Sequence, residues 1–276
     1  QSLFPTVTGD ELIGTVDNDI KSAAADGKTA VWQALVKRIQ DLPDYLPFFY
    51  AAYPALKNQD EITIAQIANA LAAFVATEWR SDKTPFDAYL RGDDTALTAQ
   101  QRRGMNVFYG KAGCSLCHSG PFQTDHRFYN VANPLWRLDA DLSNDLTGLH
   151  RDRADFTGQP RDQYRRRTPS LRNVSATAPY GHAGSFATLD GFLRHHLDPV
   201  SGLNRMTAEL SRENAIADSV SVAVEAMIKT VELVPVVLSA TEFDDLRSFL
   251  DGLTEEESLS GSLGRPKEVP SFLALD

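Results

Sequence analysis

Both cysteines of this 276-residue chain fall in one short segment, GKAGCSLCHSG, which spans residues 110–120. Two residues separate Cys114 from Cys117, and His118 follows directly. Thiolates and imidazoles are ligands for soft and borderline metals, and thiols also form covalent bonds. This segment is therefore the part of the sequence with the clearest capacity for chemistry.

Several kinds of site use a cysteine pair of this spacing. A structural zinc site needs about four ligands, and the chain has no second C-x-x-C to supply them. A thioredoxin-like dithiol needs a βαβ setting, whereas the flanking sequence has a helical pattern. A disulfide between residues three apart is strained, and it leaves His118 without a role.

A covalently attached c-type haem accounts for all three residues at once. The thiols of Cys114 and Cys117 form thioethers with the haem vinyl groups, and the His118 imidazole binds the iron from the proximal side. The sequence favours haem over zinc, and zinc over a redox dithiol. Bacteria attach c-type haem on the outer side of the cytoplasmic membrane, so we expect a periplasmic or secreted protein.

Composition narrows the class of protein further. Hydrophobic residues make up 42% and charged residues 23% of the chain, as in ordinary globular proteins. A net charge of −10 argues against a nucleic-acid partner, and no apolar run is long enough to span a bilayer. The one dense basic run, residues 161–167, is expected to bind a haem propionate or backbone carbonyls, or to be solvated. We interpret the start at Gln1 as processed or truncated.

Helical periodicity dominates the chain, and strand signals are few. Thr98 is a suitable N-cap for the helix that leads into the cysteine motif. Apolar residues recur at steps of three and four in the expected helices, at residues 28–50, 61–79, 98 to 110 or 113, 188–197, 207–230 and 240–253. Residues 119–170 are polar, and so long a loop is usually functional or wraps around something. The sequence predicts a mainly α protein with long loops.

Three stretches together resemble the bacterial di-haem cytochrome c peroxidase superfamily, which includes a MauG-like branch. They are ITIAQIANALAAFVATEWRSDKTPFDAYLRGD, GKAGCSLCHSGPFQTDHRFYNV and RTPSLRNVSATAPYGHAGSFATLDGFLRHHLDP. The third is especially specific, because T-P-x-L-R-N followed by T-A-P-Y-x-H-x-G is hard to obtain by chance. The resemblance runs from about Gln1 to Leu253.

The resemblance implies two haem domains, of which this chain carries one. Members of the family hold two c-type haems, each in its own helical domain, and the motif here matches the second haem site. We expect residues 96–276 to form that C-terminal cytochrome c-like haem domain. Residues 1–95 are then a helical inter-domain segment that completes a missing N-terminal haem domain. The chain resembles the C-terminal two-thirds of a di-haem protein, whether it was cleaved, truncated or shortened naturally.

The resemblance also places the distal ligand of the haem iron. In the family it lies fourteen residues after the histidine of T-A-P-Y-x-H, and it is usually Met or, in MauG, Tyr. Counting from His182 leads to His196, with His195 as its rival and Met206 as a more distant candidate. Two histidine ligands should lower the reduction potential, because imidazole stabilises ferric iron better than a thioether does.

Further site residues follow from the same resemblance. His182 matches a family histidine near the haem, and the carbonyls of Thr177 and Pro179 match positions that help bind a calcium ion between the haems. A third calcium ligand, an upstream Asn, is missing here. Arg172 is expected to pack near the haem or pair with a propionate. Glu11 resembles the acid that moves a proton of hydrogen peroxide at the N-terminal haem.

The resemblance implies a haem oxidoreductase of the peroxidase type. In the intact protein, hydrogen peroxide would be reduced at the upstream haem, and the haem of this chain would relay or store electrons. These would come from an electron-donor protein or from a protein substrate that is oxidised. A non-enzymatic monohaem electron-transfer module and a MauG-like maturation of a partner protein are the alternatives.

Overall fold

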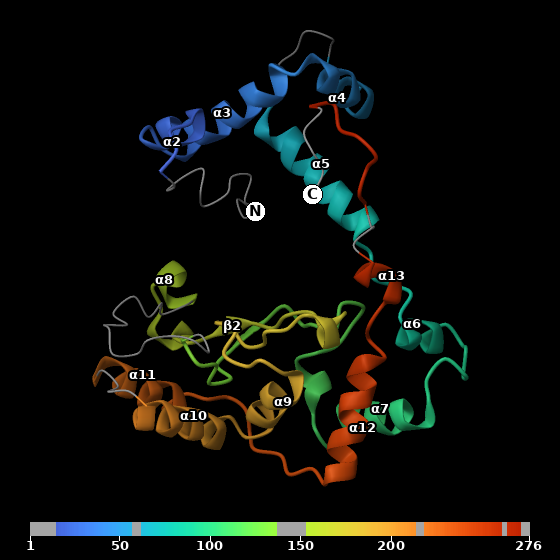
Figure 1. Ribbon diagram of the computed structural model, residues 1–276, viewed down its shortest axis with the longest axis vertical. Helices are drawn as coiled ribbons and strands as arrows, with labels where there is room; N and C mark the ends of the chain where they lie inside the picture. The colour runs from blue at the N-terminus through green and yellow to red at the C-terminus, as the bar shows by residue number, and fades with distance from the viewer. Residues whose placement is uncertain (1–14, 57–61, 137–152, 214–217, 261–263, 272–276) are drawn as a thin grey trace. The chain divides into compact units, whose positions relative to one another are not determined.

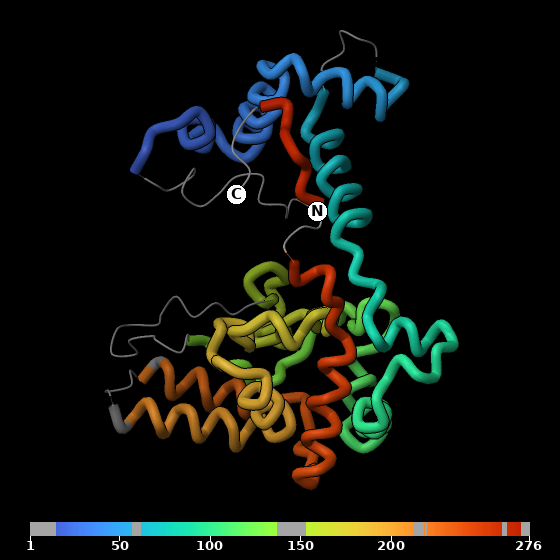
Figure 2. Tube along the Cα trace, turned by 45° about the vertical axis from the view of Figure 1, so that its right-hand side comes forward, coloured from blue at the N-terminus to red at the C-terminus, as the bar shows by residue number. Residues whose placement is uncertain are grey.

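The computed structural model describes residues 15–56, 62–136, 153–213, 218–260 and 264–271 (Figures 1 and 2). The chain divides into two compact units, one formed by residues 1–80 and 260–276 and the other by residues 81–259. Helices are the main secondary structure in the described parts of both units, and the strands described are two residues long. The predicted mainly α fold is confirmed. The assignment of residues 1–95 and 96–276 to two haem domains stays a prediction.

The first unit is helical in its described part. Its elements are α2 (Asp19–Ala24), α3 (Lys28–Gln40), the 3₁₀ turn η1 (Pro43–Tyr45), α4 (Leu46–Ala52) and α5 (Ile64–Glu78). The helix predicted over 28–50 is thus broken near Pro43, which has no N–H to continue the ladder. Helix α5 begins at Thr63, in a capping box with Gln66.

The second unit contains the cysteine motif. Its elements are α6 (Pro85–Leu90), α7 (Ala99–Tyr109), η2 (Cys114–Leu116), β1 (Phe128–Tyr129), α8 (Arg153–Thr157), η3 (Pro160–Asp162), β2 (Arg166–Arg167), η4 (Val174–Ala176), α9 (Leu189–Leu197), α10 (Pro199–Glu213), α11 (Asp218–Lys229), α12 (Ala240–Asp251) and α13 (Glu256–Leu259). As predicted, Thr98 caps α7, and Gly110 ends it. The helix expected over 207–230 is two elements, and α10 begins earlier, at Pro199.

Two apolar clusters hold this unit together. In the first, α7 packs against α12, and the rings of Phe108 and Phe249 lie 5.2 Å apart between their centroids (Figure 1). In the second, Trp136 packs with Leu203 of α10 and with Val220, Val224 and Met227 of α11. The first cluster reaches the cysteine motif through Cys114, so the α7–α12 crossing positions the site.

The closest approach of α7 to α12 occurs at Gly104. A Cβ atom there would lie 1.8 Å from the backbone oxygen of Asp245 and 2.8 Å from the Phe249 Cβ atom. Gly104→Ala therefore forces the helices apart, and overpacking of this kind costs about 1–3 kcal/mol or more. We expect the melting temperature to fall by several degrees. Thermal unfolding followed by circular dichroism measures this change. Asn106→Ala, at an exposed position of the same helix, is the control. An unchanged Gly104→Ala melting temperature would contradict the packing.

Candidate functional site

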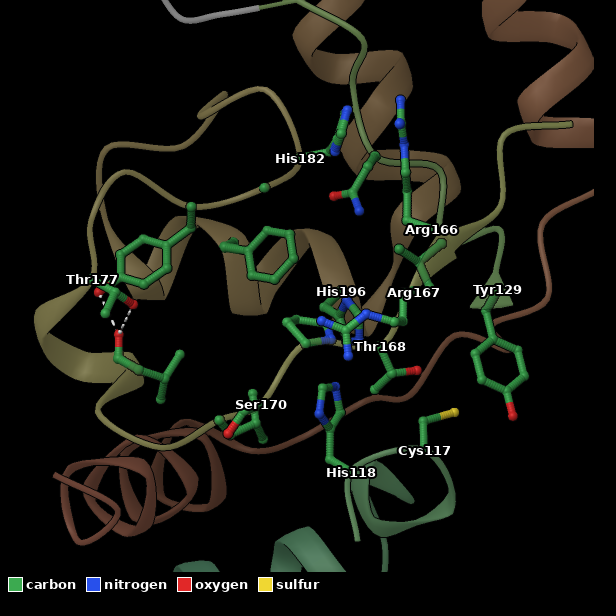
Figure 3. Close-up of a pocket in the computed structure, with 18 of the residues that line it drawn as sticks. Cys117, His118, Tyr129, Arg166, Arg167, Thr168, Ser170, Thr177, His182 and His196 are labelled. Atoms are coloured by element: carbon green, nitrogen blue, oxygen red, sulfur yellow. Dashed lines mark hydrogen bonds between the residues drawn. The ribbon is translucent and has the colours of Figure 1, made fainter. Parts of the chain in front are cut away.

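The cysteine motif is presented at the end of α7 by a left-handed glycine. Gly113 has a φ of 65°, which turns the chain into the 3₁₀ turn η2. The His118 N–H then donates to the Cys114 carbonyl at 2.9 Å, which closes a tight loop over the motif. Cys117 and His118 line a cavity of about 340 Å³, while Cys114 packs against the first apolar cluster (Figure 3).

The tautomer of His118 is set by a backbone contact. Its Nδ1 lies 3.1 Å from the carbonyl oxygen of Gln123, so Nδ1 carries the proton and donates. Nε2 is then the nitrogen with a lone pair, as in metal-bound histidines whose other nitrogen is held by a carbonyl. Burial lowers the pKa of His118, which keeps the ring neutral. His118 is thus prepared as a metal ligand.

A second imidazole faces His118 across the cavity. Helix α9 begins at the N-cap Thr188 and carries His196 in its last turn. The ring centroids of His118 and His196 are 6.4 Å apart, and Figure 3 shows the two rings opposed. A histidine nitrogen binds a metal at about 2 Å and lies roughly 1 Å from its ring centre, so one metal between two rings separates their centres by roughly 6 Å. The spacing fits one haem iron held from both sides.

The surroundings of His196 also suit a ligand. Its Nδ1 is buried without a hydrogen-bond partner. Burial, followed by the proximity of His118 and His195, lowers the pKa of His196 to about 3, so the ring is neutral. A buried nitrogen without a partner is costly in an apolar site. Both ring nitrogens of His195 are also buried without a hydrogen-bond partner among the described residues, so it is the position of His196 in the cavity wall that favours it as the ligand.

The other two candidates for distal ligand lie elsewhere. His195 is buried outside the cavity lining, with its ring 5.0 Å from that of Phe186 between centroids. Met206 packs against the apolar clusters. Adjacent residues on a helix point about 100° apart, so α9 can aim only one of its two histidines at the cavity. Of the three predicted residues, the structure brings His196 opposite His118.

The remaining cavity wall is mainly apolar and also carries two cationic residues. Arg166 and Arg167, two members of the basic run predicted to meet a propionate, line it. Arg165 instead pairs with Glu232. The other lining residues are Tyr129, Val131, Asn133, Thr168, Pro169, Ser170, Leu171, Val174, Thr177, Pro179, Tyr180, Gly181, His182, Phe192 and Leu233. A flat, mainly apolar group with anionic substituents suits such a wall.

Arg172 is held by contacts with other residues of the protein. Its guanidinium forms a bidentate pair with Asp87, at 2.7 and 2.8 Å, and donates to the carbonyls of Pro121 and Ser81. These acceptors occupy the side chain, and Arg172 is not among the cavity-lining residues. The expectation that Arg172 packs near the haem or pairs with a propionate stays a prediction. Arg172 joins α6 to the loop that follows His118, and so it positions the site.

The pair of Asp87 and Arg172 should also set part of the acid stability of this unit. Burial alone would raise the pKa of Asp87, but hydrogen bonds from Arg172 and Thr84 hold it below its ordinary value. The resulting stabilisation is present above the unfolded-state pKa of about 3.9 and is lost as pH falls through the folded-state pKa.

Asp87→Asn should therefore destabilise the unit by about 3–5 kcal/mol at neutral pH, because it leaves a buried guanidinium without its anion. Urea unfolding at several pH values measures the effect, and the difference from the native chain should shrink below about pH 4. Asp93→Asn, at an exposed carboxylate that contacts Thr95, is the matched control. A loss that does not depend on pH would contradict this explanation.

The remaining predicted residues are placed as follows. Thr177, Pro179 and His182 line the same cavity, and Figure 3 shows His182 apart from the opposed pair. The Thr177 hydroxyl donates to the Val174 carbonyl at 3.1 Å. The calcium ion predicted at Thr177 and Pro179 stays a prediction. Glu11 lies outside the described residues.

The alternatives to haem are not supported by the geometry of the motif. Cys114 and Cys117 are not joined by a disulfide. Burial raises the pKa of Cys114 to about 11, which suppresses the thiolate that redox chemistry needs. In the parts of the chain that the structure describes, no group of three or more His, Cys, Asp or Glu side chains is arranged to hold a metal ion. A four-ligand zinc site is therefore not formed around these described thiols.

Sequence reasoning missed three residues that shape the site. Gln123 supplies the carbonyl that orients His118, and Tyr129 donates its hydroxyl to Asp125 Oδ2 at 2.7 Å beside Cys117. These contacts depend on how the loop after His118 folds back, which periodicity does not reveal. Asp125 and Tyr129 are four positions apart, a spacing that brings side chains together on a helix. Because this segment is not helical, the spacing did not predict their contact.

Comparison with known proteins gives consistent results. The family profile described as di-haem cytochrome c peroxidase matches residues 9–95. A cytochrome-c peroxidase of Denitromonas iodatirespirans is 33% identical over 78% of this chain and 56% of its own length. The methylamine utilization protein MauG of Methylorubrum extorquens is 31% identical over 63% of this chain and 45% of its own.

Solved structures agree with these relatives. A MauG-like protein associated with microbial copper homeostasis aligns with a TM-score of 0.58 and 26% identity, covering 90% of this chain and 72% of that chain. The diheme peroxidase BthA from Burkholderia thailandensis aligns with a TM-score of 0.57 at 21% identity, over 82% of this chain and 59% of that one, which supports the fold alone.

The chain spans 56% and 60% of the length of two cytochrome-c peroxidases that it matches. Among the described helices, none combines the length and apolar character needed to cross a bilayer.

Proposed function

We propose that this chain is a member of the di-haem cytochrome c peroxidase and MauG family, whose profile matches residues 9–95, and that it relays or stores electrons for the reduction of hydrogen peroxide at another haem. The haem would be attached to Cys114 and Cys117 and held by His118 and His196. When bound, it supplies a reversible one-electron couple between ferric and ferrous iron. The residues of the chain would hold the haem in position and set its reduction potential.

The opposed pair of His118 and His196 is the observation that carries this proposal. Catalytic metal sites keep an open coordination position for the substrate, whereas a site with both axial positions filled by protein does not. The 6.4 Å between the ring centroids suits two ligands on one iron. Such a site suits electron transfer better than the binding of peroxide.

The first unit supports a separate haem site for the reduction of peroxide. Helix α5 has no buried residue, and Leu71 and Phe74 on it are each 36% exposed despite their apolar side chains. A largely apolar helix normally buries one face against another element. We propose that this unit completes a domain in which peroxide is reduced, with Glu11 as its acid and the N-terminal haem segment as its partner.

The electron source and the location belong to the same proposal. Covalent haem attachment supports a periplasmic or secreted protein. The electrons would come from a donor protein or from a protein substrate, and an acidic chain with a net charge of −10 would attract a basic partner. A calcium ion at Thr177 and Pro179 would tie the loop before His182 to the haem cavity.

Peroxide turnover tests the proposal. The protein expressed from its complete reading frame and residues 1–276 alone are each matured with haem c and mixed with hydrogen peroxide and a reduced dye. We expect residues 1–276 to carry one haem and consume little peroxide, and a reading frame with a second haem motif to sustain turnover of about 1–10³ per second. Fast turnover by residues 1–276 alone would contradict the electron-transfer role. The absence of turnover from a two-haem protein would contradict the peroxidase assignment.

A further inference from the structure

Tyr129 lies in the wall of the candidate haem cavity, next to a residue that would carry a thioether. It ends strand β1 and is paired with Arg166 of β2. Tyr129 and Cys117 both line the cavity, and Figure 3 shows their side chains as neighbours. Burial raises the pKa of the Cys117 thiol, and a contact with the Tyr129 hydroxyl opposes that rise. Its position brings the phenol ring next to a haem attachment point.

The hydroxyl of Tyr129 has a base within hydrogen-bond distance. It donates to Asp125 Oδ2 at 2.7 Å, while Asp125 Oδ1 accepts from the Arg127 N–H at 2.9 Å. The Asp125 N–H donates to the Cys117 carbonyl at 2.8 Å, which ties the carboxylate to the attachment turn. Burial would raise the pKa of Asp125, but its hydrogen bonds hold it below the ordinary value. The carboxylate is therefore ionised at neutral pH.

We propose that Tyr129 and Asp125 form a proton-coupled one-electron redox site beside the haem attached at Cys117. When Tyr129 is oxidised, it gives up one electron, and its O–H bond breaks as the proton moves to Asp125 Oδ2. A neutral phenoxyl radical and a neutral carboxylic acid result, and the reverse transfer restores both groups. The electron acceptor is a one-electron oxidant, which in the cell is the oxidising equivalent left by hydrogen peroxide. The natural oxidant rests on the proposed function, whereas the site can be tested without peroxide.

Tyr180 provides a matched comparison within the same cavity. It also lines the wall and is buried, but its hydroxyl donates to the carbonyl oxygen of Val174 at 2.9 Å. A peptide carbonyl is a very weak base, so oxidised Tyr180 would keep its proton as a buried cation, which is unfavourable. The difference between the two tyrosines is the presence of the Asp125 carboxylate. Of the two tyrosines, Tyr129 should therefore be the one that is oxidised.

Flash-quench oxidation of the haem-loaded protein tests this assignment. Photogenerated tris(bipyridine)ruthenium(III) removes one electron, and electron paramagnetic resonance detects the tyrosyl radical. We expect Tyr129→Phe to remove most of the signal and Tyr180→Phe to leave it in place. Asp125→Asn keeps a hydrogen-bond acceptor but no base, so the radical should form about 100-fold more slowly, with a larger solvent deuterium isotope effect. The haem absorption spectrum of each variant shows that the fold and the iron ligands are intact.

The outcomes separate this inference from the proposed function. A full tyrosyl signal in Tyr129→Phe, or an unchanged rate in Asp125→Asn, would overturn the redox site. The same variants made in the complete reading frame are then frozen after mixing with hydrogen peroxide. A radical under flash-quench conditions together with no peroxide turnover would contradict the proposed function and leave the site standing. If the protein turned over peroxide without forming a Tyr129 radical, Tyr129 would have no part in peroxide reduction.

Discussion

Replacing both Cys114 and Cys117 with serine should abolish covalent haem attachment. Both thioethers need a thiol sulfur, and the part of the cavity wall next to His118 contains Cys117. Intact mass under denaturing conditions should then lose the haem increment, and acidified organic solvent should extract any haem that remains. The described structure offers no other cysteine, and neither does the sequence.

Single variants give the control for this prediction. Cys114→Ser and Cys117→Ser should each keep the haem through one thioether, with a shifted pyridine haemochrome band because one vinyl group stays unsaturated. Ser115→Ala changes a residue between the two thiols and should leave the band unaltered. A double variant that still carries haem through denaturation would show that the motif is not the attachment site.

Replacing His196 with methionine should raise the reduction potential of the haem. Axial ligands move haem potentials over a range of about 0.8 V, and a thioether favours ferrous iron where imidazole favours ferric iron. We expect a shift on the order of 100 mV, read by redox titration of the haem absorption bands. The change should also weaken the thermodynamic drive to deliver electrons to peroxide at the other haem.

His195 supplies the control for that substitution. It is adjacent in sequence and buried, yet its ring packs against Phe186 and Phe192 outside the cavity lining. His195→Gln should lower stability and leave the potential within a small margin of the native value. If His195→Gln moved the potential and His196→Met did not, the distal ligand would be His195.

The sequence was informative where local rules decide the structure. Thr98 begins α7 and Gly110 ends it, as their capping preferences predict. The motif predicted two thiols and a proximal imidazole from residues within one turn of chain, and the structure places Cys117 and His118 in the wall of one cavity. The count from His182 led to His196, and the structure brings that ring opposite His118.

Long-range contacts explain what could not be predicted. Arg172 pairs with Asp87, a residue 85 positions earlier in the chain. Periodicity carries no information about such partners. Helix α10 begins at Pro199, eight residues before the predicted start at residue 207. Proline is tolerated in the first turn of a helix, so Pro199 does not require a long loop between α9 and α10.

The ligation of the iron tests the central claim most directly. Near-infrared magnetic circular dichroism of the ferric haem-loaded chain distinguishes two histidine ligands from a histidine and a methionine, and low-spin from high-spin iron. We predict the charge-transfer band of low-spin iron with two histidine ligands in residues 1–276. A high-spin spectrum, or the band of a histidine–methionine pair, would contradict the placement of His118 and His196 on one iron.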